Sequence, residues 1–110
     1  MASDVRRAEN EAVFRVANEQ LEQYAVANVN DDVGRVLPFL CECDRVDCTQ
    51  VLLVTLPEYE RVRADSRRSV LAKGHDNPEI ERVVEETDRF AVTEKFGAAA
   101  EAYGALDPRT

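Results

Sequence analysis

Three cysteines fall within one short segment of this chain, and they restrict its fold more than any other feature. They form the pattern Cys41-Glu42-Cys43, four residues, then Cys48, and the sequence contains a single histidine, His75. Zinc takes four sulfur or nitrogen ligands at tetrahedral corners. Cysteines this close together supply several corners at little loop-closure cost. We therefore predict a Cys3His metal site made by Cys41, Cys43, Cys48 and His75, with zinc as the first choice of ion.

His75 stands in a predicted loop, between Gly74 and Asp76 and after an expected strand. A loop histidine that follows glycine has little packing reason to be there, so its position favours a metal ligand over a core residue. We expect Asp76 to accept a hydrogen bond from the other ring nitrogen, because such a contact fixes the tautomer of a metal-bound imidazole. Four protein ligands leave no position for water, so the predicted site is structural and not catalytic.

The cysteines have acidic neighbours, Glu42, Asp44 and Asp47. We interpret these three as solvated turn residues and not as further ligands, because short acidic side chains are common in turns.

The same four residues allow other interpretations. Three cysteines and one histidine suit a [2Fe–2S] cluster in principle. Two of the thiols could instead form a disulfide in a redox or metal sensor. The cysteines could also be ordinary buried residues. A catalytic Cys–His pair is the least favoured hypothesis, because three thiols compete for one base and no oxyanion site is visible.

The composition fits one small acidic domain. The chain has 110 residues, 45% of them hydrophobic, and no tryptophan, so its core is modest and a metal would add useful stability. The formal net charge is -8. This charge opposes binding to nucleic acid, which needs clustered Lys and Arg, and it also opposes docking on anionic lipid.

The residues that begin the chain predict a cytoplasmic protein. The first ten are polar and charged, unlike a signal peptide, and no apolar run in the sequence is long enough to span a bilayer. Thiols in the cytoplasm stay reduced. An odd number of cysteines also argues against a closed disulfide framework.

A long amphipathic helix is predicted over residues 4–28, ended by the Asn, Asp and Gly of residues 28–34. The residues expected on its inward face share helical spacing and are Val13, Val16, Ala17, Leu21, Tyr24 and Ala25, with Phe14 at the edge. We expect this face to pack on the chain's own domain. The alternative is that it pairs with a protein partner or forms a homodimer through the N-terminal helix.

The middle of the chain predicts a hairpin closed by the metal. Pro38 restricts residues 36–40 to an edge strand or an extended lead-in to Cys41, and the β-branched run 49–56 is expected to form a buried strand. A helix is expected from Pro57 to about Ala64, with Thr55 as its N-cap and Glu58 completing a capping box.

Residues 69–73 predict a short strand before Gly74. Two β-rich runs, 80–86 and 89–95, flank Thr87-Asp88 and favour a hairpin, although a helix over 78–87 also matches the spacing of the apolar residues. An Ala-rich helix is expected over 97–106.

These elements predict a single α+β domain spanning 1–110, with a small antiparallel sheet. The N-terminal helix and loop take residues 1–35, the metal-organised body takes 36–95, and the C-terminal helix and tail take 96–110.

Several motifs together resemble a known family. They are FLCEC followed by four residues and Cys48, then LPEYERVR, GHDNPEIERVVE, VTEK and a final DPR, and they cover the chain from Pro38 to Arg109. This set is similar to that of a family of small actinobacterial proteins with the same cysteine turn, an EYE-x-VR helix and a GH-x-x-P loop. Leu56-Pro57 and Ser69-Val70 depart from the family's pattern, but neither departure touches the four ligands. The resemblance supports the site and implies no particular activity.

The sequence therefore predicts a zinc-stabilised interaction or regulatory module with a protein partner. The alternative is a redox or metal sensor that uses the cysteine cluster. An enzyme with an open metal position is a weaker hypothesis, because no catalytic set of residues is visible.

Overall fold

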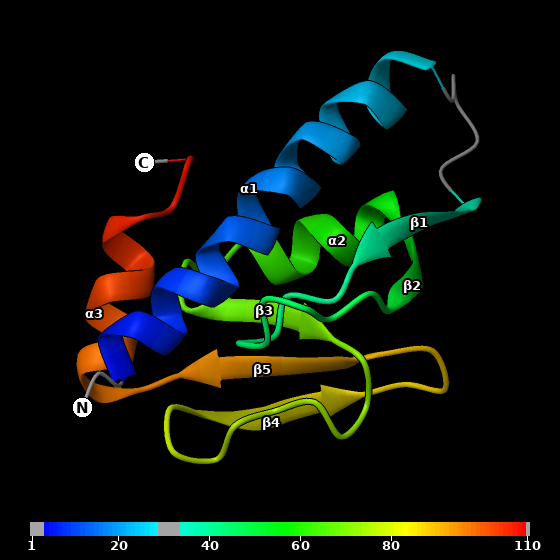
Figure 1. Ribbon diagram of the computed structural model, residues 1–110. Coiled ribbons are helices and arrows are strands. Elements are labelled where there is room, and N and C mark those ends of the chain that lie inside the picture. Colours follow the sequence, from blue (N-terminus) through cyan, green and yellow to red (C-terminus); the bar gives the residue numbers. More distant parts are fainter. Residues whose placement is uncertain (1–3, 29–33, 110) are drawn as a thin grey trace.

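The computed structural model describes residues 4–28 and 34–109 and has the predicted α+β fold (Figure 1). Its elements are α1 (Asp4–Asn28), β1 (Val36–Leu40), β2 (Val51–Thr55), α2 (Leu56–Arg63), β3 (Arg68–Leu71), β4 (Glu81–Glu86), β5 (Ala91–Lys95) and α3 (Gly97–Ala105). The strands form two antiparallel sheets, β1-β2 and β3-β5-β4. None of the helices in the described ranges combines the length and the apolar character needed to cross a bilayer.

The β1-β2 hairpin explains why proline is tolerated in β1. The amide of Cys41, just after the strand, donates to Gln50 O on the β2 side, whereas the amide of Leu40 donates to the side chain of Asn18 on the other side. Backbone directions alternate along a strand, so Pro38 shares the outward direction of Leu40. Its missing N–H therefore leaves the pairing with β2 intact.

The second sheet confirms the predicted hairpin and excludes the competing helix over 78–87. Strand β4 pairs with β5, with a bulge between Val83 and Glu85, and β5 lies in the centre of the sheet. The connection is longer than the two residues expected, because Thr87 closes a turn with Phe90: Thr87 N donates to Phe90 O at 2.8 Å.

Helix α2 begins as the sequence predicts. The Thr55 hydroxyl accepts from the Glu58 amide, and the Glu58 carboxylate accepts from the Thr55 amide, which completes a capping box. Tyr59 and Val62 are buried on its inner face. The Tyr59 ring stacks on Phe39 of β1 with 4.5 Å between ring centroids, so α2 is fixed against the first sheet.

The prediction for α1 was wrong in its orientation. Val13 is 65% exposed and Tyr24 is 70% exposed, and Val16 and Leu21 are also exposed, whereas Ala25 is buried as expected. The buried residues lie mainly on the polar side of the helix: Ala8, Glu11, Ala12, Arg15, Asn18, Glu19, Glu22 and Ala25. Helix α1 therefore packs on the body through polar side chains and turns its larger apolar residues outward.

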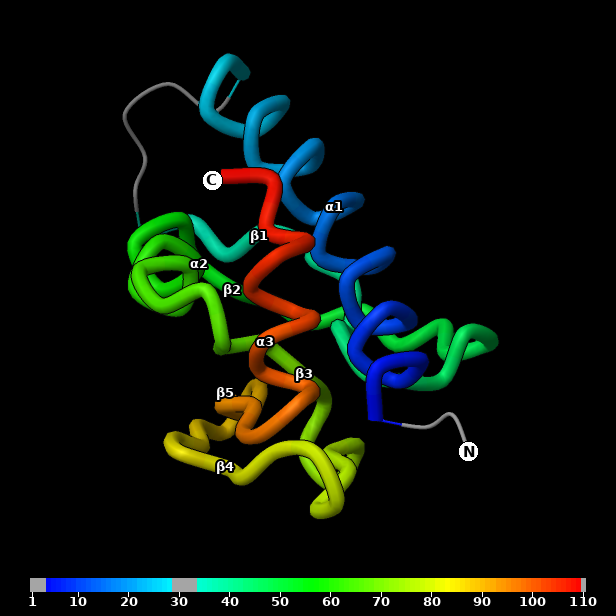
Figure 2. The backbone as a smooth tube through the Cα atoms, turned by 90° about the vertical axis from the view of Figure 1, so that its left-hand side faces the viewer, coloured from blue at the N-terminus to red at the C-terminus, as the bar shows by residue number. Residues whose placement is uncertain are grey.

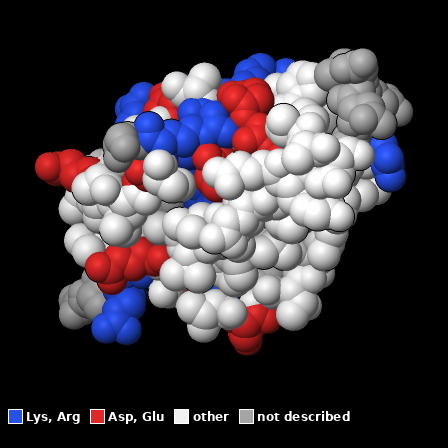
Figure 3. Space-filling view, turned by 90° about the horizontal axis from the view of Figure 1, so that it is seen from above, with Lys and Arg blue, Asp and Glu red and all other residues white. Residues whose placement is uncertain are grey.

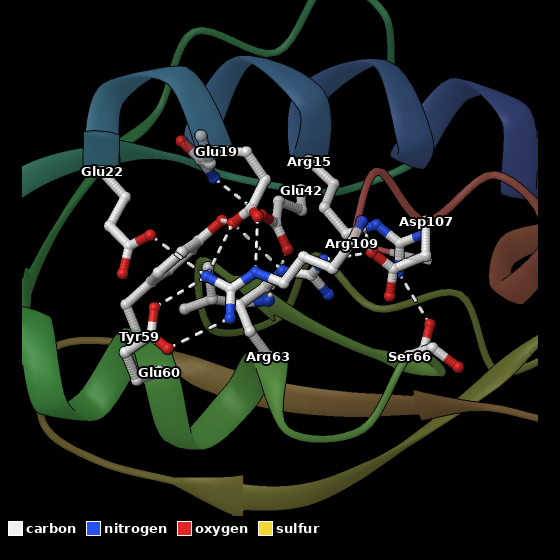
Figure 4. A network of polar contacts seen from close by, with 12 residues as sticks. Arg15, Glu19, Glu22, Glu42, Tyr59, Glu60, Arg63, Ser66, Asp107 and Arg109 are labelled. Carbon is white, nitrogen blue, oxygen red and sulfur yellow. Dashed lines mark hydrogen bonds and ion pairs between the residues drawn. The ribbon is translucent and has the colours of Figure 1, made fainter. Parts of the chain in front are cut away.

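A buried polar network between α1, α2 and the C-terminal segment accounts for this orientation (Figure 4). Arg63 of α2 donates to Glu19 of α1 at 3.2 Å and also binds Asp107. The Tyr59 hydroxyl donates to Glu19 at 2.7 Å. Because these charges are paired and hydrogen-bonded, they tolerate burial that would otherwise be costly.

Helix α3 lies beside α1, as the tube view shows (Figure 2). Apolar residues of the two helices meet at Ala8, Ala12, Ala99 and Tyr103, together with Ile80. Arg15 of α1 crosses this contact with its guanidinium 3.5 Å from the centroid of the Tyr103 ring. A larger apolar cluster joins the hairpin, α2 and β3.

Candidate metal centre

The structure brings all four predicted ligands together. Cys41, Cys43 and Cys48 lie on the metal loop, the segment 41–50 that links β1 to β2, and His75 follows β3. One ligand atom from each residue lies within 4.8 Å of the others. Cys41 and Cys43 are buried, whereas Cys48 and His75 are partly exposed. These four residues form a group that could hold a metal ion.

Two sulfur–nitrogen distances in the group match the edges of a tetrahedral site. The Nδ1 atom of His75 lies 3.6 Å from Sγ of Cys41 and 3.7 Å from Sγ of Cys48. A tetrahedral ion about 2.3 Å from sulfur and about 2.0–2.1 Å from nitrogen would hold those two atoms about 3.6 Å apart. Nδ1 is therefore the imidazole atom that faces the site.

Local backbone structure positions His75 and Cys41. Gly74 has φ +85°, a left-handed conformation that residues with a Cβ rarely adopt, and it turns the chain directly before the histidine. The His75 amide donates to Ala72 O at 3.0 Å and closes this turn. The Ala72 amide donates to the Cys41 sulfur at 3.2 Å, which ties the end of β3 to the metal loop.

The contact between Cys41 and Cys43 shifts the pKa values of the two thiols in opposite directions. A hydrogen bond from Cys41 is the largest cause that lowers the pKa of Cys43, to about 5, and His75 contributes in the same direction. The same hydrogen bond, followed by burial, raises the pKa of Cys41. Cys43 is thus the favoured thiolate, and a divalent cation would bind the remaining sulfurs as thiolates by displacing their protons.

Glu42 is not the solvated turn acid that we predicted. It is fully buried, its carboxylate accepts from Asn18 Nδ2 at 2.8 Å and from the Val70 amide at 3.0 Å, and burial raises its pKa. The physical reason is the alternation of side chains in extended backbone. Since Cys41 and Cys43 face the site, Glu42 between them points to the opposite side, where Asn18 and Val70 bind it. The C-x-C spacing is the sequence feature from which the burial of Glu42 could have been predicted.

The other two acids near the site, Asp44 and Asp47, differ in their exposure. Asp47 is exposed, as predicted. Asp44 is partly buried and accepts from Asn77 Nδ2 at 2.8 Å, a contact between the metal loop and the segment after His75. In the described ranges no hydrogen bond joins Asp76 to the imidazole, so the expected contact of Asp76 is not formed. Asn77 links the two ligand-bearing segments instead.

Comparisons of the chain with protein-family models, with curated proteins and with solved structures gave no match. The function is therefore inferred from the residues of the site and from the fold that positions them.

Proposed function

We propose that this chain is a small cytoplasmic interaction module whose fold is stabilised by one zinc ion bound to Cys41, Cys43, Cys48 and His75. The ion would link the metal loop to the segment after β3, two parts of the chain that are distant in sequence. The main support is the pair of sulfur–nitrogen distances, 3.6 and 3.7 Å, which match the edges of a single tetrahedral centre.

The donor set and the spacing favour zinc over an iron–sulfur cluster. A [2Fe–2S] cluster divides its four ligands between two irons, so ligands on different irons lie farther apart than the corners of one tetrahedron. Here all four ligand atoms lie within 4.8 Å of one another. Thiolate and imidazole ligands in tetrahedral geometry are typical of zinc.

A zinc ion with four protein ligands has a structural role. No coordination position remains for water, so the ion would not generate a hydroxide for catalysis. We therefore infer that the chain acts by binding, and its net charge of -8 favours a protein partner over nucleic acid. Membership of the actinobacterial family that the motifs resemble stays a prediction.

Elemental analysis of protein purified without a metal-binding tag tests the proposal directly. We expect about one zinc per chain in the wild type and less than a tenth of that in His75→Ala and Cys48→Ser. Asp76→Asn, which changes a neighbour of His75 outside the group of four possible ligands, is the matched control and is expected to keep its zinc. Wild-type protein that carries no metal, or that carries iron with inorganic sulfide, contradicts the proposal.

A pull-down with wild type and with His75→Ala tests the link between the ion and the partner. We expect the variant to lose partners that the wild type retains, because the module would no longer be fully folded. Equal folding and equal binding by the two proteins would count against a structural role for the ion.

A redox sensor is the second candidate, and the partial exposure of Cys48 and His75 is the observation that favours it. A peroxide can reach this side of the cluster, oxidise two thiolates to a disulfide and be reduced to water. Counting free thiols before and after mild peroxide treatment distinguishes the candidates. Loss of two thiols together with release of the ion supports the sensor, and three thiols that stay protected by the metal exclude it.

A further inference from the structure

The outward side of α1 carries an apolar surface that no described part of the chain covers. Its four large members are Val13, Val16, Leu21 and Tyr24, with exposed fractions of 65%, 40%, 39% and 70%. The view from above shows a broad uncharged area beside a cluster of charged side chains (Figure 3). We call the outward side of residues 10–28 the α1 outer face.

The α1 outer face contains no charged residue. Residues 10–28 include four charged side chains, Glu11, Arg15, Glu19 and Glu22, and all four are buried on the opposite side of the helix. The other outward residues are neutral, among them Ala17, Gln20 and Gln23. In a chain with 33% charged residues, a helical face of this length without charge is unusual.

Electrostatics directs any association between two copies of this acidic chain to this face. Two chains with a net charge of -8 repel each other across most of their surfaces. Within residues 10–28 neither copy brings a charge to this face, so its apolar surface can be buried without opposing like charges. Glu9, which is exposed, borders the face at its N-terminal end.

The spacing of the outward residues fits an antiparallel pair. Positions 13, 16, 17, 20, 21 and 24 are symmetric about their midpoint. A two-fold axis through that midpoint sets Val13 opposite Tyr24 of the second copy and Val16 opposite Leu21 of the second copy. A parallel pair would instead oppose Glu9 to its own copy and would align the two helix dipoles unfavourably.

We propose that two copies of this chain associate through their α1 outer faces, antiparallel around a two-fold axis. A hollow of 290 Å³ lined by Glu9, Ala12, Val13, Val16 and Leu106 lies beside Val13. It gives room for the Tyr24 ring of the second copy, which lies opposite Val13 in this arrangement.

The available area sets the expected strength of the dimer. The four large apolar side chains leave roughly 400 Å² uncovered on each copy, which is within the range of functional patches on small proteins. With the neutral residues around them, two copies bury on the order of 1,000 Å², at the lower end of specific interfaces. A dissociation constant of about 1–100 μM is therefore expected.

Sedimentation equilibrium of the metal-loaded protein tests the association. The wild-type mass is expected to rise from 12.4 kDa towards twice that value as the concentration increases to about 200 μM. Val13→Lys and Tyr24→Glu each weaken the dimer at least about tenfold, because each places a charge against an apolar side chain. Val84→Lys, at a residue of β4 that is 38% exposed, is the control and dimerises like the wild type.

The double variant Val13→Lys/Tyr24→Glu tests the direction of pairing. In the antiparallel arrangement the introduced lysine of each copy lies opposite the introduced glutamate of the other copy. Opposite charges therefore pair at both ends of the contact, and dimerisation is restored. In a parallel arrangement each charge faces its own copy and the double variant is the weakest of all. Circular dichroism of every variant checks that the fold is retained.

Two results would overturn the proposal. One is a wild-type mass of 12.4 kDa throughout the concentration range. The other is failure of the double variant to recover while both folded single variants dissociate. The dimer does not depend on the identity of the metal, so zinc content measured on the same samples separates failure of this proposal from failure of the proposed function.

Discussion

The side-chain amide of Asn18 lies 2.8 Å from the buried carboxylate of Glu42, and this contact joins α1 to the start of the metal loop. Asn18 also bonds both backbone groups of Leu40, donating to the carbonyl at 2.9 Å and accepting from the amide at 2.8 Å. Asn10, two turns earlier, donates to Asp44 O at 3.2 Å. Two asparagines therefore hold the metal loop against α1. A change that disturbs the metal loop is expected to destabilise the packing of α1, and a change in α1 is expected to destabilise the metal loop.

Asn18→Ala is predicted to be strongly destabilising. Asn18 is fully buried, and its removal leaves the Leu40 amide and carbonyl without these partners and takes one hydrogen bond from Glu42. Buried groups left unsatisfied cost about 1–3 kcal/mol each, so we expect a loss of about 2–4 kcal/mol in the free energy of unfolding. Urea denaturation of the metal-loaded protein measures this loss.

Arg6→Ala is the matched control for Asn18→Ala. Arg6 lies on the same helix but is exposed and outside the α1 outer face, so its replacement is expected to change stability by less than about 0.5 kcal/mol. Equal effects of the two substitutions would show that Asn18 does not secure the metal loop.

Removal of the metal is predicted to lower thermal stability sharply. An ion that binds only the folded chain stabilises it by mass action, and the ligands come from two separate segments. We expect a chelator to lower the Tm of the wild type by about 10 °C or more, which corresponds to about 2 kcal/mol for a domain of this size. Differential scanning calorimetry with and without chelator is the measurement.

Variants of the ligands identify the source of that chelator effect. His75→Ala is expected to melt near the temperature of the chelated wild type and to be insensitive to chelator. Asp47→Asn, at an exposed residue of the same loop, is expected to respond like the wild type. A chelator that shifts the Tm of His75→Ala as much as that of the wild type would indicate a different metal site.

Features that depend on neighbouring residues were predicted correctly from the sequence. The cysteines of the site lie within one loop, and the chain has a single histidine, so few ligand sets were available. The capping box of Thr55 and Glu58 spans one turn of helix, and its signal is complete within that turn.

The orientation of α1 could not be predicted in the same way. Its polar residues are buried because their partners come from distant segments: Glu19 binds Arg63, 44 positions away, and Glu11 binds Lys95 across an even longer stretch of chain. Helical periodicity identifies two faces, but it does not reveal that charged residues on one face will be neutralised by the fold. The hydrophobic face was therefore assigned to the wrong side.

Lys95→Met is predicted to be among the most destabilising single substitutions. Its ammonium lies 2.6 Å from Glu11 and 2.7 Å from Glu81, and all three side chains are fully buried. Without the lysine, two carboxyl groups share an apolar interior with no cation between them. We expect a loss of about 3–5 kcal/mol in the free energy of unfolding, measured by urea denaturation.

A second substitution is expected to recover part of that loss. Burial is the main cause that raises the pKa of Glu11 well above its ordinary value, so a neutral side chain suits its position. Glu11→Gln in the Lys95→Met background should therefore restore about 1–2 kcal/mol. Lys73→Met, at an exposed lysine, is the control and should be nearly neutral. If Lys95→Met is as mild as this control, the buried ion pair contributes little to the fold.

The pair formed by Glu22 of α1 and Glu60 of α2 predicts a pH dependence of stability. Arg109 lies between the two carboxyl groups and donates to both, at 3.1 Å to Glu22 and 2.7 Å to Glu60 (Figure 4). Burial, followed by the hydrogen bond to Glu60 and its charge, raises the pKa of Glu22 from 4.5 to about 7. At pH values between 4.5 and about 7, Glu22 keeps its proton in the folded chain but has released it in the unfolded chain.

A raised pKa in the folded state gives stability that is present at low pH and is lost as the pH rises through about 7. We expect this group to lower the free energy of unfolding by about 1–2 kcal/mol between pH 5 and pH 8. Glu22→Gln is neutral at every pH, so it should remove this decline, whereas Glu86→Gln, at an exposed residue of β4, should retain it. Urea denaturation across this range provides the comparison, and contributions of the metal ligands cancel because all three proteins share them. Parallel curves for the wild type and Glu22→Gln would mean that Glu22 is ionised in the folded protein and that Arg109 neutralises both carboxylates.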